Sequence, residues 1–306
     1  MDNIKNNVTL VVSSCDKYED AWYPYFELIK KYWADRPQKI ALITETKSFS
    51  CEGLDIKVCN NQRENETWSE RLYNCLKGID TDYIIFSLED FFLLGAVNDD
   101  AIERCYNWME EDKNIAVCRL YSSSNENLIQ SDKYGDFRIA DASIDYRLDT
   151  QVALWRKEAL MDFIDIKENP WQFESIGTKR VKNSDKTFLW HYCETLDDTN
   201  NRIFPYQMQA KYGYGIAWGC WLWNNKKWFL ENGINKVKYG KLGSLSRKAV
   251  FRRLDHLYCD QANKKKSFID KLITPIWKLG IKAKKVKQNV MTLGIKKGLK
   301  ESWKSR

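Results

Sequence analysis

The sequence predicts an α/β protein built on a mostly parallel sheet with helices on both faces. Two observations support this class. Short β-branched runs alternate with segments of helical spacing, which is the rhythm of repeated βαβ units. The composition, 43% hydrophobic and 30% charged, is that of a globular protein, and 306 residues suffice for one large domain or two ordinary ones. Aromatic residues reach 14%, so we also expect rings to line a ligand cleft.

The predicted strands are compact and rich in β-branched residues. In chain order they are residues 8–14, 39–45, 54–60, 82–88 and 115–121. The predicted helices repeat apolar residues at steps of three and four, and they are residues 20–33, 66–79 and 99–111. Pro24 is expected in the first turn of the first helix, where a missing N–H is tolerated.

Cysteine and histidine usage disfavours two common kinds of site. The nine cysteines are odd in number and form no C-x-x-C pair, so a reducing cytosol is expected rather than a disulfide framework. The two histidines lie near no paired cysteines, which disfavours zinc. The N-terminal residues lack signal-peptide character, and no run approaches the ~20 apolar residues of a spanning helix, so we expect no membrane crossing.

The charge is concentrated at the C-terminus. Residues 261–306 contain 13 Lys and 1 Arg against 2 acidic residues, a net charge of +12, which leaves −5 on residues 1–260 of a chain that carries +7. Apolar residues of this tail recur at helical steps, interrupted at Pro275. We therefore place a domain boundary near residue 260 and expect a basic amphipathic helical tail that lies on an anionic membrane surface through residues 264–306. Docking on the body, oligomerisation and nucleic-acid binding are the alternatives.

Polar side chains follow three of the predicted strands. Ligands of parallel sheets bind beyond the carboxyl ends of the strands. This rule selects Ser13, Ser14, Cys15 and Asp16 after the first strand, Glu45 after the second, and Glu89 and Asp90 after the fourth. The first strand is not followed by G-x-G-x-x-G, and the chain has no Walker lysine motif, so dinucleotide binding and P-loop NTPase activity are disfavoured.

The adjacent acidic residues Glu89 and Asp90 are the most specific indication of a binding site in the sequence. Two adjacent carboxylates at the end of a buried strand repel each other at low dielectric unless a cation accompanies them. Mg²⁺ or Mn²⁺ would supply that charge and would bridge a diphosphate. The alternative is an ordinary solvated acidic turn.

Four stretches carry a family likeness. They are VVSSCDKYEDAW (residues 11–22), TWSERLYNCLKGIDTDYIIFSLEDFFLLG (67–95), YRLDTQVALWRKEAL (146–160) and NPWQFE (169–174). Together, over roughly residues 8–235, they resemble a GT-A-fold nucleotide-sugar glycosyltransferase of the bacterial surface-polysaccharide type, which builds capsule or lipopolysaccharide. The resemblance implies a domain over residues 1–260, with a nucleotide-binding part at about 1–125 and an acceptor part at about 126–260. Such enzymes usually carry an Asp-x-Asp motif, whereas residues 87–90 of this chain are Ser-Leu-Glu-Asp. Asp90 fits the metal-binding aspartate of that motif, and Glu89 takes the sugar- or ribose-binding position.

The resemblance also implies roles for individual residues. The donor-binding candidates are Ser13, Ser14, Asp16, Glu45, Trp68, Arg71, Glu89 and Asp90, with Arg71 open to interpretation as a surface arginine. An inverting enzyme needs a general base, for which Glu174 is the first candidate and Asp149 the second. The acceptor-side candidates are Gln151, Trp171 and Trp218, and a retaining enzyme would depend more on Gln151.

The leading interpretation is therefore a hexosyl or related transferase. It would move a sugar from a nucleotide diphosphate, UDP above all, to a lipid-linked oligosaccharide or polysaccharide precursor, with Mn²⁺ or Mg²⁺ as cofactor. The tail would hold it as a cytoplasmic, peripheral protein on the inner face of the cell membrane. The alternatives are a catalytically silent scaffold of the same fold and a nucleic-acid-binding protein that uses the basic tail. The acidic body counts against nucleic acid as a partner.

Overall fold

A computed structural model describes residues 2–60, 62–63, 65–194, 202–206, 216–217, 220–221 and 228–234. The predicted boundary near residue 260, the tail over residues 261–306 and Trp218 lie outside these residues. None of the helices within the described residues is long and apolar enough to cross a membrane.

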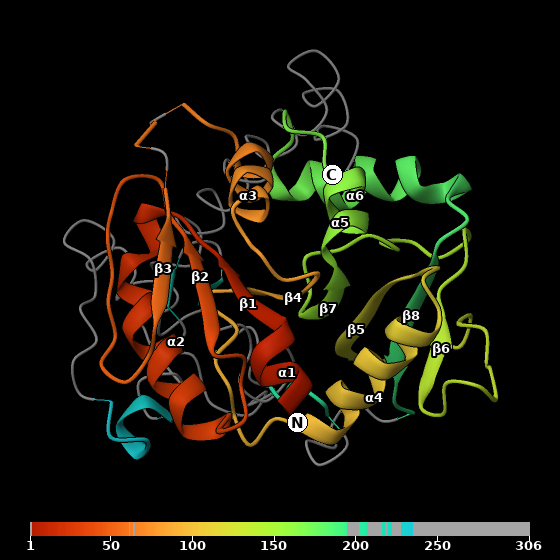
Figure 1. Cartoon of the computed structure of the whole chain (residues 1–306), viewed down its shortest axis with the longest axis horizontal. Helices are drawn as coiled ribbons and strands as arrows, with labels where there is room; N and C mark the ends of the chain where they lie inside the picture. Colours follow the sequence, from red (N-terminus) through yellow and green to blue (C-terminus); the bar gives the residue numbers. More distant parts are fainter. Residues whose placement is uncertain are drawn as a thin grey trace, which may run out of the picture.

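An eight-stranded sheet forms the centre of the molecule (Figure 1), with strand order β3-β2-β1-β4-β7-β5-β8-β6. Four of its seven pairings are parallel: β1 with β2, β1 with β4, β2 with β3, and β5 with β8. The strands are β1 (Val8–Ser13), β2 (Lys39–Ile43), β3 (Ile56–Cys59), β4 (Tyr83–Leu88), β5 (Ile115–Ser123), β6 (Phe137–Ile139), β7 (Ala153–Arg156) and β8 (Thr187–Tyr192). A separate antiparallel pair consists of β9 (Ile216–Ala217) and β10 (Cys220–Trp221).

Helices cover both faces of the sheet. One face packs against α1 (Asp2–Asn7), α2 (Glu19–Tyr32) and α4 (Asp99–Glu111). The other packs against α3 (Trp68–Lys77), α5 (Lys157–Phe163) and α6 (Pro170–Arg180), which gather on one side of Figure 1. Two short 3₁₀ turns are η1 (Asp16–Tyr18) and η2 (Val181–Asn183). The predicted α/β class, with a mostly parallel sheet and helices on both faces, is confirmed.

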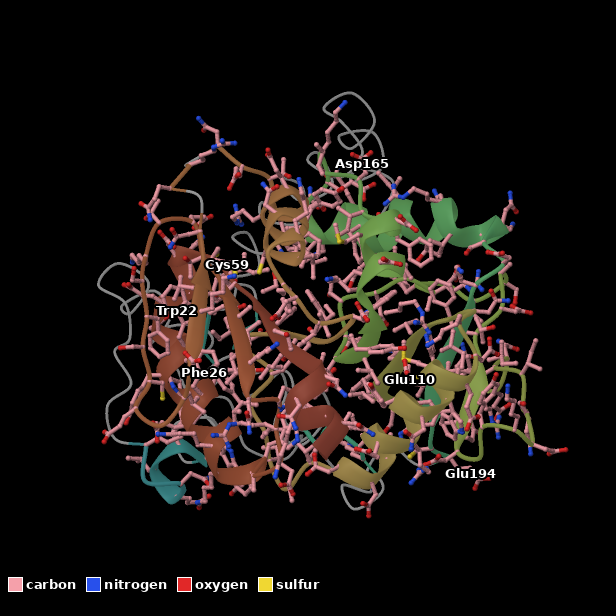
Figure 2. All side chains as sticks on the ribbon, in the orientation of Figure 1. Trp22, Phe26, Cys59, Glu110, Asp165 and Glu194 are labelled. Carbon is pink, nitrogen blue, oxygen red and sulfur yellow. The ribbon has the colours of Figure 1, made fainter. Side chains whose placement is uncertain are left out.

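Each core layer follows from the alternation of side chains along β1. Leu10 and Val12 face the layer of α2, where Trp22 and Phe26 are also buried (Figure 2). Val11 points to the opposite face and packs in the layer of α3, α5 and α6. A strand that is buried on both faces reads as a continuous apolar run, and this is the pattern that predicted β1.

Pro24 is the one backbone prediction that is wrong. The helix α2 begins at Glu19, directly after the turn η1, so Pro24 lies in its second turn rather than its first. Because proline has no N–H, it cannot donate the helical hydrogen bond to the carbonyl of Asp20. Tertiary burial of the helix tolerates this loss, since Trp22, Phe26 and Ile29 are each at most 2% exposed.

The helix α6 begins with a capping box. The side chain of Asn169 accepts a hydrogen bond from the N–H of Gln172, and the side chain of Gln172 accepts one from the N–H of Asn169. Pro170 occupies the first turn, where it costs no hydrogen bond. The segment NPWQFE is thus a helix start, and this start fixes the position of Glu174 one turn later.

Asn169→Ala is expected to lower the free energy of unfolding by about 1 kcal/mol, because the N–H of Gln172 loses its acceptor. Asn169→Asp keeps an acceptor at the cap and should lose much less. Urea unfolding followed by circular dichroism measures both variants, and equal losses would contradict the capping role.

Candidate active site

The carboxyl ends of β1, β2 and β4 lie side by side at one edge of the sheet. The strands are parallel neighbours, and Ser13 pairs with both Ile43 and Leu88. The residues that follow these strands therefore meet at the same edge, as the sequence predicted. The side chain of Ser14, directly after β1, lowers the pKa of Glu89, directly after β4, so the two residues are neighbours at this edge.

Glu89 and Asp90 form a pair of repelling carboxylates. Glu89 is buried and Asp90 is half-buried. Burial, followed by the charge of Asp90, raises the pKa of Glu89 well above its ordinary value, and burial raises the pKa of Asp90 to about 7. Within the described part of the chain, neither carboxylate has a Lys, Arg or His nitrogen within 4.0 Å. The interpretation as a solvated acidic turn is therefore wrong for Glu89, which is 7% exposed.

Arg71 and Cys15 border this pair. Burial, then the charges of Glu89 and Glu45, raise the pKa of the Cys15 thiol to about 12, while Arg71 opposes them. Arg71 is only 9% exposed, and its Nη1 lies 3.6 Å from Oε1 of Glu45 and donates to the carbonyl of Glu66 at 2.9 Å. Its Nε has no hydrogen-bond partner among the described residues. The interpretation of Arg71 as a surface arginine is wrong, because α3 carries it into the site edge.

Asp16 and Glu45 lock two loops together. The carboxylate of Asp16 accepts hydrogen bonds from the N–H groups of Glu45, Thr46 and Lys47 and from the hydroxyl of Thr46. Glu45 Oε2 in turn accepts from the N–H of Asp16 at 2.8 Å. Burial favours a higher pKa for Asp16, but the hydrogen bonds outweigh it and lower the pKa. Asp16 is therefore a loop clamp in this structure, with its acceptor capacity used by backbone.

The hydroxyls of Ser13 and Ser14 are held by tryptophans. Trp68 Nε1 donates to Ser13 Oγ at 2.9 Å, and Trp22 Nε1 donates to Ser14 Oγ at 2.7 Å. Both serines are at most 5% exposed. The two serine hydroxyls thereby fix the positions of the Trp68 and Trp22 rings near this edge.

A second cluster lies beside the carboxylate pair because β7 runs antiparallel between β4 and β5. Ala153 of β7 pairs with both Phe86 and Arg119, so the residues before β7 extend past the end of β4. Here Asp149 Oδ2 lies 2.9 Å from Arg119 Nε, an ion pair whose angle falls short of a hydrogen bond. Burial raises the pKa of Asp149 to about 6; Arg119 lowers it and Glu174 raises it.

Glu174 lies close to Asp149 but is already engaged. Its Oε1 accepts hydrogen bonds from the N–H of Thr150 at 3.0 Å and from the hydroxyl of Thr150 at 2.6 Å. Gln151, the next residue, accepts a hydrogen bond from the hydroxyl of Tyr206. The structure thus brings both predicted base candidates and Gln151 to one place, and it uses Glu174 to hold the loop that carries the other two.

Four aromatic residues that the sequence did not single out surround this cluster. The guanidinium of Arg119 lies 4.0 Å from the ring centre of Trp190 and 5.1 Å from that of Tyr121. Tyr206 stacks on Phe91 with ring centres 4.3 Å apart, and Phe91 directly follows Asp90. This stack joins the second cluster to the carboxylate pair. One signal was available in the sequence, since Arg119 is a charged residue inside an otherwise apolar predicted strand.

Trp171 lies at the start of α6 and is 50% exposed, so its ring is available to a ligand. Ile166, in the loop that leads to α6, is 45% exposed. Of the two tryptophans predicted to bind the acceptor, Trp171 lies within the described residues and Trp218 lies outside them.

A hydrogen-bonded Ser-His-Asp chain occurs elsewhere in the sheet. His191 Nδ1 lies 2.9 Å from Ser122 Oγ, and His191 Nε2 lies 3.3 Å from Asp136 Oδ2. Ser122 and His191 are each 3% exposed, so a substrate has no access to this hydroxyl. We regard the chain as a structural connection between β5, β8 and the loop before β6.

The carboxylate pair fits a divalent cation that shares its ligands with a substrate. No group of three or more His, Cys, Asp or Glu side chains in the described residues forms a complete metal site. Mg²⁺, however, is commonly held by one or two carboxylates together with substrate phosphates. Asp90 and Glu89 satisfy this donor set, and their mutual repulsion is the observation that favours a cation there.

Comparisons with known proteins do not identify the family. No family model matches the chain, and no curated protein matches it. Among solved structures, S. aureus TarS is 14% identical over 61% of this chain and 36% of that chain, with a TM-score of 0.39. The chain thus spans about a third of that structure.

Two further solved structures show a similar degree of likeness. A cytidylyltransferase from Leptospira borgpetersenii is 10% identical over 86% of this chain and 100% of that chain, with a TM-score of 0.41. A glucosyl-3-phosphoglycerate synthase from Mycobacterium tuberculosis, solved with Mn²⁺ and UDP-glucose, is 8% identical over 51% and 58%, with a TM-score of 0.32. Likenesses at this level carry no functional assignment.

Asp90→Asn is expected to stabilise the protein above pH 7 when divalent ions are absent. The pKa of Asp90 is raised to about 7 in the folded protein from the ordinary value of 3.8. Its contribution to stability is therefore fully present below about pH 4 and is lost as the pH rises to about 7. The variant should gain on the wild type across this window, by about 2 kcal/mol at pH 8 after allowance for partial exposure. Urea unfolding between pH 4 and 8 measures the difference.

Mn²⁺ provides the second half of this test. At pH 8 it should raise the Tm of the wild type and leave that of Asp90→Asn unchanged. Asp132→Asn, which removes an exposed carboxylate, serves as the control and should behave as the wild type does. A variant that responds to Mn²⁺ like the wild type would contradict a cation at Asp90.

Arg119→Met is expected to raise the pKa of Asp149 from about 6 to about 7 or higher, because a neighbouring arginine ordinarily lowers a carboxyl pKa by about 1 to 3. Carbon-13 titration of labelled aspartates measures the pKa, with Asp149→Asn used to assign the signal. Arg104→Met removes an arginine that pairs with Asp136 and should leave Asp149 unchanged. An unchanged pKa in Arg119→Met would show that the ion pair does not control Asp149.

Proposed function

We propose that the protein is a nucleotide-sugar glycosyltransferase whose donor site is the edge formed by β1, β2 and β4. The observation that carries the proposal is the pair of repelling carboxylates, Glu89 and Asp90, at the end of the central strand β4. A buried pair of like charges is costly unless a ligand brings positive charge to it. A nucleotide diphosphate with its divalent ion brings that charge and fills the position where parallel sheets bind ligands.

The departing nucleotide diphosphate develops negative charge as the bond to the sugar breaks. A divalent ion held by Asp90 and Glu89 would stabilise that charge electrostatically. Among the described residues, Arg71 brings a guanidinium to this edge, and a guanidinium can donate to phosphate oxygens. The rings of Trp68 and Trp22, fixed by Ser13 and Ser14, would define the space for the donor.

Asp149 is the better candidate for the general base. With a pKa of about 6 it is largely ionised at neutral pH, yet it remains basic enough to accept a proton from an acceptor hydroxyl. Glu174, the first candidate from the sequence, already accepts two hydrogen bonds from Thr150. We therefore assign Glu174 to positioning the loop that carries Asp149. In a retaining enzyme, Gln151 would take the place of Asp149 as the residue nearest the sugar.

The acceptor is proposed to be a lipid-linked oligosaccharide or polysaccharide precursor. The half-exposed ring of Trp171 supports a saccharide acceptor, because aromatic faces stack on sugars. The lipid anchor, the cytoplasmic face of the membrane and the capsule or lipopolysaccharide product are proposals from the sequence and from the basic tail over residues 261–306.

Asp90→Asn is expected to lower the rate of nucleotide release by about 10² to 10³, because the variant loses stabilisation of the leaving group. UDP-, GDP- and CMP-sugars are screened with Mn²⁺, first by thermal shift and then by the nucleotide released on transfer or hydrolysis. Asp132→Asn is the matched control and should keep full activity.

Three other results of this screen would contradict the proposal. Full activity in Asp90→Asn removes the assignment of Asp90. Binding of no nucleotide at all favours a silent scaffold or a nucleic-acid-binding protein. When a nucleoside triphosphate and a free sugar acid are added to the same screen, release of pyrophosphate would instead indicate nucleotidyl transfer.

A further inference from the structure

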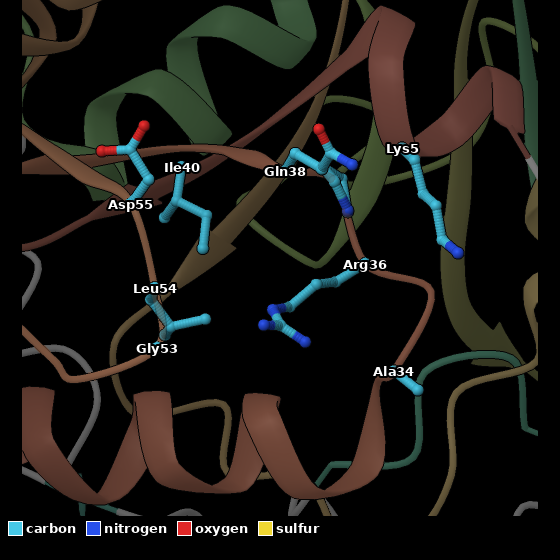
Figure 3. Close-up of a pocket in the computed structure, with 9 residues that line it drawn as sticks. Lys5, Ala34, Arg36, Gln38, Ile40, Gly53, Leu54 and Asp55 are labelled. Carbon is cyan, nitrogen blue, oxygen red and sulfur yellow. The ribbon is translucent and has the colours of Figure 1, made fainter.

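A cavity of about 310 Å³ lies at the opposite end of the sheet from the carboxylate pair. Its walls come from residues 34 and 36–38 between α2 and β2, from Ile40 near the start of β2, from residues 53–55 before β3, and from Lys5 of α1 (Figure 3). Since β1 to β4 all run in the same direction, residues that precede β2 and β3 lie at the amino ends of the strands. The cavity is thus separated from Asp90 by the length of a strand, and its volume is at the lower end of the range for small-molecule sites.

The guanidinium of Arg36 occupies the middle of this cavity. Its side chain extends toward Ile40 and Leu54, whose apolar groups line the cavity beyond its tip (Figure 3). Among the described residues, one of its five N–H donors is used: Nη1 donates to the carbonyl of Trp33 at 3.2 Å. Arg36 is half-buried, and burial lowers the pKa of its guanidinium. The guanidinium therefore bears a desolvation cost that one carbonyl offsets in part.

The charged groups that the structure describes around Arg36 do not supply it with a counter-ion. Lys5 is neutralised by Asp35, at 2.5 Å. Among the described residues no carboxylate lies within 4.0 Å of Arg36, and Asp55, on the far wall, directs its carboxylate away from it (Figure 3). Cys51 is also close, but burial raises the pKa of its thiol to about 11, so it is neutral at physiological pH. The guanidinium thus faces the cavity as a cation that no described carboxylate compensates.

We propose that this cavity binds a small organic anion, a carboxylate or phosphate ester with a short apolar group. The planar fork of Arg36 matches the two oxygens of such an anion, and Ile40 and Leu54 would cover its apolar group. Gln38, at the rim, adds an amide that can donate to the same oxygens. The site is distinct from the donor edge and does not depend on the function proposed above.

Butyrate, acetate and butyramide separate the two parts of this recognition on the full-length protein. Butyrate should bind at millimolar concentration and shift the Nε–Hε resonance of Arg36. Acetate should bind roughly tenfold more weakly, since it lacks two of the methylene groups that the apolar walls would cover. Butyramide has the shape of butyrate without its charge and should also bind at least about tenfold more weakly. Butyl phosphate distinguishes the two anion classes, because the tighter of the two anions identifies the head group that the site prefers.

Variants locate the binding in the cavity. Arg36→Gln should abolish the binding of butyrate, while Lys39→Gln should not change it. Lys39 makes the matched control, because it lies three residues away, is exposed and pairs with Asp80 outside the cavity. Leu54→Ala should weaken butyrate several-fold and leave acetate unchanged, and this comparison holds even if Arg36→Gln fails to fold.

Three results would overturn the proposal. The first is equal binding of butyrate and butyramide, which would remove the role of charge. The second is equal loss in Lys39→Gln and Arg36→Gln, which would indicate diffuse attraction to a basic surface. The third is displacement of butyrate by a nucleotide sugar, which would place the ligand at the donor edge instead.

Discussion

The repulsion between Glu89 and Asp90 is the constraint on which the functional argument depends. Hydrophobic burial fixes β4 in the centre of the sheet, and the strand delivers both carboxylates to its end whether or not a cation is present. A fold that served stability alone would place an apolar or singly charged residue here. The raised pKa values of both groups mean that their ionised forms are destabilised in the folded protein. A ligand that brings positive charge can offset this destabilisation.

Strand topology decides which residues share this edge. If β5 paired directly with β4, Asp149 would have no reason to lie near Asp90. The antiparallel strand β7 inserts between them, so the loop before β7 emerges where β4 ends. The fold thereby brings the carboxylate pair at residues 89 and 90 together with Asp149, some 60 residues later. The stack of Phe91 on Tyr206 holds the two clusters in contact.

Local patterns in the sequence predicted most of the elements because their signals are local. Residues 99–111 are α4 as predicted, and the other elements predicted in the first 121 residues differ from the observed ones by at most three residues at either end. The sequence did not predict that β7 lies between β4 and β5 in the sheet. It also did not predict the ion pair of Asp149 with Arg119 or the contact of Tyr206, because each depends on pairing between distant segments. Glu174 shows the same limit: its acidic side chain was visible in the sequence, but the capping box and the bonds from Thr150 that occupy it were not.

The two ends of the sheet present the same physical problem with opposite sign. Among the described residues, no Lys, Arg or His nitrogen lies within 4.0 Å of the adjacent carboxyl groups at the carboxyl end, and no carboxylate lies within 4.0 Å of Arg36 at the amino end. Elsewhere in the described residues the fold compensates such groups: Arg147 donates to three backbone carbonyls, and Arg180 pairs with Glu168. Because compensation is available to this fold, its omission at two places is informative. A charge that the chain leaves uncompensated beside an open space is one that a ligand can satisfy, and the sign of the charge specifies the ligand.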